Sequence, residues 1–163
     1  MLKYYAGIGS RSTPKNILHL MRHVAKSLAC RGYILRSGGA RGADKAFESG
    51  CLGKKEIFTA KDATYRSVYH AELFHPNWDR VSPYAKLLLA RNSQIVLGEN
   101  LDKPVEFVVC YTPDAQVVGG TGQALRVAKG YQIPIHNLGD PEQVRLVEDH
   151  LEDHAKTCEF CRD

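Results

Sequence analysis

The fold is decided by the stretch Tyr33-Ile34-Leu35-Arg36-Ser37-Gly38-Gly39-Ala40-Arg41-Gly42-Ala43-Asp44. Its first four residues are typical of a short buried strand, and the glycines that follow predict a tight turn. A short helix is expected from this turn to about Ser49. A strand that enters a helix through a glycine-rich turn is the basic unit of a parallel sheet.

The same alternation extends in both directions along the chain. Strands are expected at residues 2–6, 33–36, 55–59, 105–111 and 133–137. Further helices are expected between Pro14 and Gly32, at residues 84–98 and 119–130, and from Pro141 onward, because apolar residues recur every three or four positions. Residues 60–83 are rich in aromatic side chains but show no sustained period. The pattern predicts an α/β fold with a Rossmann-like, open, mainly parallel sheet and helices on both faces. Residues 1–140 would form this domain, and residues 141–163 a C-terminal helix with a Cys/His tail.

Composition places the chain among ordinary globular proteins. It has 163 residues, of which 44% are hydrophobic and 25% charged, with a formal net charge of +4. This excess favours anionic partners but is weaker than that of a dedicated duplex-DNA binder. No apolar run approaches the roughly 18 residues that cross a membrane, and no secretory signal is recognisable. We therefore expect a cytoplasmic protein with no membrane partner, in which Cys30, Cys51 and Cys110 are reduced.

Three glycine-rich loops follow predicted strands and would meet at one edge of the sheet. Glycine allows a backbone to approach an anion, and a helix N-terminus adds free N–H groups and a partial positive charge. Arginine can grip phosphate through two parallel hydrogen bonds. The predicted ligand contacts are Gly9, Ser10, Arg11, Ser37, Gly38, Gly39, Arg41, Gly42, Asp44, Gly119, Gly120, Thr121 and Gly122. None of these loops is a Walker motif or a complete dinucleotide fingerprint.

The order of these segments resembles one superfamily. Gly7 to Arg11, Ser37 to Asp44, the pair Arg91-Asn92, and Gly119 to Gly122 are similar to motifs of the SLOG superfamily. That superfamily contains the DNA-processing A recombination mediators and the "lonely guy" phosphoribohydrolases. The resemblance covers about residues 5–138 and is greatest to short, stand-alone DNA-processing-A-like proteins of bacteriophages. It implies that Arg91 and Asn92 also belong to the site and that the protein is a homodimer or a larger oligomer.

Three functions follow from this resemblance and from the loops. The leading hypothesis is binding of a nucleotide or nucleotide-derived ligand, and the alternative is a single-stranded DNA-binding recombination accessory. A third hypothesis is a nucleotide N-glycosidase that uses Asp44 or Asp114 as its carboxylate. The phosphoribohydrolases carry a glutamate where this chain has Arg126, so binding is better supported than catalysis.

Two further groups of residues each allow two interpretations. His70, His75 and Trp78 could stack on a base, or they could pack a loop against the sheet. In the tail, His150, His154, Cys158 and Cys161 have spacings that could provide the four ligands of a structural zinc site. The alternative for the tail is a solvated terminus with two free thiols.

Overall fold

The computed structural model describes residues 1–162, which form a five-stranded parallel sheet in the order β3-β2-β1-β4-β5. The strands are β1 (Lys3–Gly9), β2 (Tyr33–Ser37), β3 (Lys55–Ile57), β4 (Val108–Tyr111) and β5 (Ile135–Asn137). The helices are α1 (Lys15–Cys30), α2 (Ala43–Gly50), α3 (Tyr65–Phe74), α4 (Pro83–Leu97), α5 (Gly119–Gly130) and α6 (Pro141–Thr157). Short 3-10 turns are η1 (Ala60–Asp62), η2 (Trp78–Arg80), η3 (Pro113–Ala115) and η4 (Glu159–Cys161). The predicted α/β class is confirmed.

The strand order reverses direction at the centre of the sheet. From β1 the chain adds β2 and then β3 on one side, and it returns to place β4 and β5 on the other. Ala6 is accordingly paired with Arg36 of β2 and with Val108 of β4. In open parallel sheets, such a reversal leaves a crevice beyond the carboxyl ends of the two strands that flank it.

β1 is buried on both faces, as a strand at the middle of a covered sheet must be. Tyr5 belongs to the core that contains α1 and α2, whereas Ala6 and Ile8 belong to the core that contains α4 and α5. A Cβ atom at Gly7 would lie 2.6 Å from Cγ of Phe47, so glycine there lets α2 approach the sheet closely.

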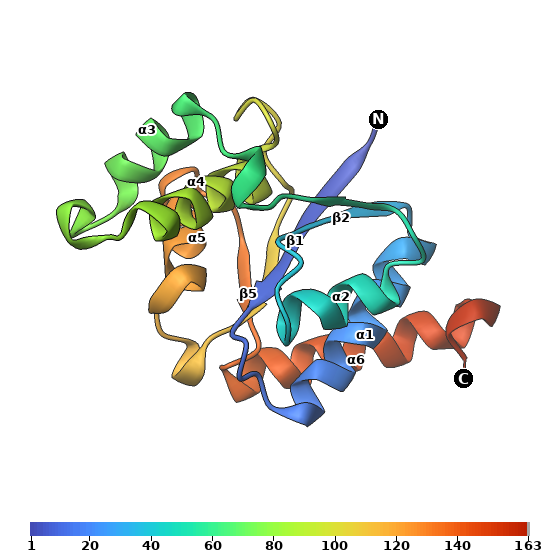
Figure 1. Cartoon of the computed structure of the whole chain (residues 1–163). Helices are drawn as coiled ribbons and strands as arrows, with labels where there is room; N and C mark the ends of the chain where they lie inside the picture. The colour runs from blue at the N-terminus through green and yellow to red at the C-terminus, as the bar shows by residue number, and fades with distance from the viewer. Residues whose placement is uncertain (163) are drawn as a thin grey trace.

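Two layers of helices cover the sheet (Figure 1). α1 and α2 pack on one face, with α6 against α1, and α4 and α5 pack on the other. α3 lies outside this second layer, in contact with both α4 and α5. No described helix is long and apolar enough to span a bilayer.

The main departure from the sequence-based expectation is α3, which lies within the stretch that showed no period. Its buried positions are Ser67, His70 and Ala71, which are small or polar, so the helix leaves no apolar stripe in the sequence. The strand predicted at residues 105–111 is shorter in the structure, where β4 covers Val108–Tyr111.

Candidate functional site

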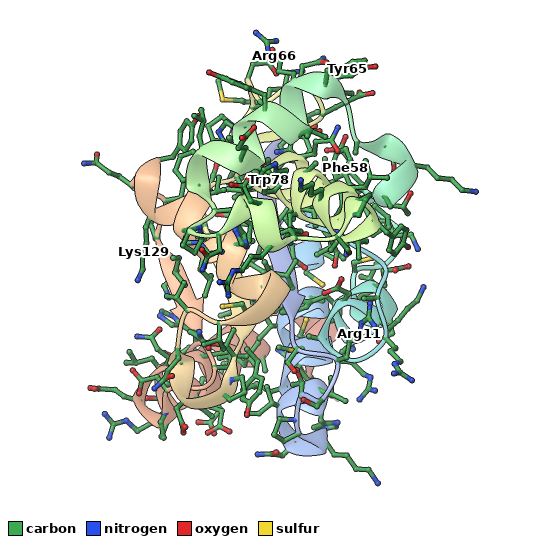
Figure 2. The ribbon with its side chains drawn as sticks, turned by 60° about the vertical axis from the view of Figure 1, so that its left-hand side comes forward. Arg11, Phe58, Tyr65, Arg66, Trp78 and Lys129 are labelled. Carbon is green, nitrogen blue, oxygen red and sulfur yellow. The ribbon has the colours of Figure 1, made fainter. Side chains whose placement is uncertain are left out.

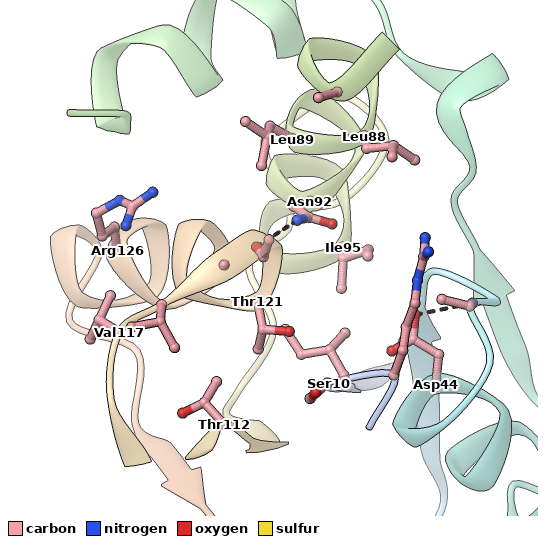
Figure 3. Close-up of a pocket in the computed structure, with 18 of the residues that line it drawn as sticks. Ser10, Asp44, Leu88, Leu89, Asn92, Ile95, Thr112, Val117, Thr121 and Arg126 are labelled. Atoms are coloured by element: carbon pink, nitrogen blue, oxygen red, sulfur yellow. Dashed lines mark hydrogen bonds between the residues drawn. The ribbon is translucent and has the colours of Figure 1, made fainter. Parts of the chain in front are cut away.

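A cavity of about 790 Å³ lies at the reversal point between β1 and β4. Its walls come from the end of β1, the segment after β4, the first turn of α5, and one face of α4 (Figure 3). This volume lies within the range of small-molecule and cofactor sites. The cavity thus occupies the position at which open α/β sheets bind their ligands.

The loop after β1 forms one wall. The Ser10 amide donates to the carbonyl of Tyr111 at 3.1 Å, which fixes the loop against β4. A Cβ at Gly9 would lie 2.8 Å from Cβ of Ala43, so a side chain at that position would push α2 away. Arg11 follows at the rim, where it is exposed (Figure 2).

The N-terminus of α5 forms the opposite wall. The first intrahelical bond runs from the Gly122 amide to the carbonyl of Val118, so the preceding N–H groups have no acceptor within the helix. Gly119 adopts a φ of +66°, which favours glycine. The side-chain amide of Asn92 donates to the carbonyl of Gly120 at 2.9 Å and holds this turn in place (Figure 3). The wall therefore presents backbone N–H groups and the positive end of a helix dipole.

Arg91 is buried beneath the cavity. Its Nη1 donates to the carbonyls of Gly38 and Phe58, each at 2.7 Å. A Cβ at Gly38 would overlap the guanidinium, so this glycine leaves room for the arginine. Arg91 thereby joins α4 to the loop after β2 and to the segment after β3.

Asp44 contributes a buried carboxyl to the same cavity. Burial raises its pKa from the ordinary value of 3.8 to about 6, and the positive charge of Arg91 and backbone N–H donors act in the opposite direction. One of these donors is the amide of Ala40, at 3.2 Å. Near neutral pH a negative charge is therefore held in the cavity at an energetic cost.

Arg126 lines the cavity at the side of α5. Its Nη2 donates to Oε1 of Gln123 at 2.7 Å, and its Nε donates to the carbonyl of Phe74 at 3.0 Å. Arg126 thus places a fixed cation beside the cavity.

The structure brings most of the predicted contacts together. The predicted residues that line the cavity are Gly9, Ser10, Arg11, Asp44, Arg91, Asn92, Gly119, Gly120 and Thr121.

Six other predicted residues do not line the cavity. Ser37 instead donates to the carbonyl of Gly7 and joins β2 to β1. Gly42, at a φ of +84°, packs against the backbone of Arg11, and Gly122 packs against Val117. Gly38 lies behind Arg91, while Gly39 and the exposed Arg41 lie outside.

The two candidate catalytic carboxylates are separated by the fold. Asp44 reaches the cavity, but Asp114 is exposed in η3 and does not line it. Asp114 adopts a left-handed backbone conformation with φ +53°, which turns the chain immediately after β4.

Of His70, His75 and Trp78, only His75 lines the cavity. His70 is buried, with Nδ1 2.9 Å from Oγ of Ser93 and Nε2 2.9 Å from the hydroxyl of Tyr131, so it packs α3 and cannot stack on a ligand. His75 lines the cavity and meets the Trp78 ring edge-on, with ring centroids 5.9 Å apart.

The sequence pattern does not reveal the apolar wall of the cavity. Ala85, Leu88, Leu89 and Ile95 of α4 line it, although the sequence marks them only as part of a helix. Their period predicts burial, and only the tertiary structure shows that they face a cavity.

No family model and no curated protein matches the chain. Among solved structures, the chain is similar to DNA-processing protein A from Helicobacter pylori, with a TM-score of 0.60 and 21% sequence identity. The match covers 93% of this chain and 81% of that one. That protein binds single-stranded DNA. At this level of identity, the likeness shows a common fold.

Proposed function

We propose that this protein binds single-stranded DNA and that the cavity between β1 and β4 receives one nucleotide of the strand. The main support for the proposal is the positive charge of the residues that line the cavity. Three arginines, Arg11, Arg91 and Arg126, line it, against one carboxylate, that of Asp44. The N-terminus of α5 adds a partial positive charge to the same cavity. The structural likeness to a protein that binds single-stranded DNA supports the same partner.

The cavity has separate surfaces for the two ends of a nucleotide. A phosphate would lie between the loop of Ser10 and Arg11 and the amides that open α5. A sugar and base would lie against the apolar face of α4, with the ring of His75 available for stacking. Binding of this kind depends on contacts with the phosphate backbone and on stacking with the base ring. Every base offers these surfaces, so little sequence preference is expected.

The first prediction tests this assignment. Arg11→Ala should weaken binding of a labelled oligothymidylate by about 1.5–3 kcal/mol, because it removes a charged hydrogen-bond donor. Loss of one phosphate contact should also make the slope of log K against log salt shallower by about 0.7. Fluorescence anisotropy across a salt series measures both quantities.

Arg31→Ala is the matched control. Arg31 is exposed and precedes β2, so it lies at the opposite edge of the sheet from the cavity. Equal losses of affinity in the two variants would place the DNA outside the cavity and overturn the proposal.

A free nucleotide or nucleotide-derived molecule is the second candidate ligand. The favouring observation is the cavity volume of about 790 Å³, which suits a ligand of that size. The two candidates differ in length dependence, since strand binding grows stronger with oligonucleotide length and with falling salt. Thymidine monophosphate that binds as tightly as a long oligothymidylate would favour the second candidate.

The second prediction concerns catalysis. N-glycosidic cleavage develops positive charge on the sugar, and Arg126 adds a like charge beside the cavity. We therefore expect no free base after incubation of the protein with common nucleoside monophosphates, as measured by chromatography. Base release that is abolished by Asp44→Asn would establish the N-glycosidase instead.

A further inference from the structure

Outside the cavity, four metal-ligating side chains gather where the C-terminal tail meets α1. They are Cys30, His154, Cys158 and Cys161, and one ligand atom from each lies within 4.8 Å of all the others. Cys30 is the last residue of α1, and His154 lies in the last turn of α6. Cys158 immediately precedes η4, and Cys161 is the last residue of that turn. Residues far apart in the sequence therefore converge on one point.

The ligand atoms of this group lie close enough together to bind one ion. With zinc–sulfur bonds of about 2.3 Å, two thiolates on one ion lie about 3.8 Å apart. The Sγ atoms of Cys30 and Cys161 are 3.5 Å apart. In addition, Nε2 of His154 is buried and has no hydrogen-bond partner among the described residues. A bond to a metal would supply that partner.

We propose that Cys30, His154, Cys158 and Cys161 form a structural zinc site with three thiolate ligands and one imidazole. This set differs from the sequence-based one, which included His150 and lacked Cys30. His150 lies four residues before His154, about 6 Å farther along the helix from the tail, and it is exposed. The fourth ligand comes instead from α1, which sequence spacing could not indicate.

The site explains how α6 is held to the domain. None of the residues in α6 is fully buried, and it contacts the core through the partly buried Val144, Val147 and Leu151. A zinc ion that joins the end of α1 to the end of α6 would fasten this weakly packed helix. Four protein ligands close the coordination sphere, which is typical of structural rather than catalytic zinc.

The test uses full-length protein that is purified under reducing conditions and titrated with Zn²⁺ or Co²⁺. We expect one metal per chain, and a cobalt spectrum with the intense absorption of tetrahedral thiolate coordination. Cys30→Ser should weaken zinc binding by at least about 100-fold, since even the loss of an outer-shell partner costs 10- to 100-fold. Thermal unfolding with and without chelator should show stabilisation by zinc in the wild type.

His150→Ala is the matched control because it removes a histidine of the same helix that lies outside the proposed set. Unchanged zinc affinity in this variant, together with its loss in Cys30→Ser, supports the site. The proposal is overturned if His150→Ala loses the metal and Cys30→Ser retains it. It is also overturned if the reduced wild type binds no zinc, or if its cobalt complex lacks thiolate absorption.

Discussion

Arg91→Met is expected to lower the free energy of unfolding by about 3–5 kcal/mol, the range for removal of one member of a buried charged network. The carbonyls of Gly38 and Phe58 would lose their shared donor, and Asp44 would lose the positive charge that favours its ionised form. Methionine keeps the unbranched shape, so the change isolates the guanidinium. In a domain of this size, the melting temperature should fall by roughly 6–20 °C.

Arg11→Met is the control for this measurement. Arg11 also lines the cavity but is exposed at its rim, so its replacement should change stability by less than about 0.5 kcal/mol. Chemical denaturation of both variants at neutral pH compares the two sites. Equal stabilities of the wild type and Arg91→Met would show that the buried guanidinium has no structural role.

Asp44 should make the free energy of unfolding decrease as the pH rises, whereas a carboxyl group with a lowered pKa has the opposite effect. Because its pKa is raised by burial to about 6, the folded protein keeps a proton between pH 4 and pH 6 that the unfolded chain has released. Stability therefore falls as the pH rises through this window. The raised pKa corresponds to about 3 kcal/mol, so Asp44→Asn should gain that much relative to the wild type between pH 4 and pH 7.

Only the pH-dependent part of the comparison is diagnostic, because asparagine also changes the hydrogen bonds of the loop. Glu48→Gln is the control. Burial acts to raise the pKa of Glu48, but hydrogen bonds from Lys55 and Lys45 outweigh it and lower the pKa. Its contribution is lost as the pH falls, so the difference from the wild type should change in the opposite direction. A pH-independent difference for Asp44→Asn would disprove the raised pKa.

The sequence predicts the fold class because its signals are local. Glycine-rich turns such as Ser37 to Asp44 follow short apolar runs, and each can be recognised without knowledge of its neighbours. The sequence does not predict α3, because this helix packs through Ser67, His70 and Ala71 and has no apolar stripe. Element boundaries also differ from the prediction. Glu106 and Phe107 already form hydrogen bonds with β1, but Val108 is the first residue in register with both β1 and β5.

The part of the candidate site that lies in loops after the strands can be predicted from the sequence. Parallel strands bring Ser10 and Thr121 to one edge, which places both at the cavity. The sequence could not indicate which glycines face a ligand and which make room for packing, as Gly38 does for Arg91. It also could not indicate that α1 supplies Cys30 to the tail, because that contact depends on how two helices pack.

The position of the cavity has a consequence for folding. Its walls are contributed by the first strand, by α4 and by the N-terminus of α5, so the cavity exists only after the two halves of the sheet have joined along β1 and β4. A bound ligand therefore bridges segments that are distant along the chain. The binding energy of the proposed ligand would oppose the separation of the halves. We therefore expect it to slow amide hydrogen exchange throughout the central strands as well as in the contacting loops. Ligand binding in the cavity would thus be thermodynamically linked to the cooperative unfolding of the whole domain.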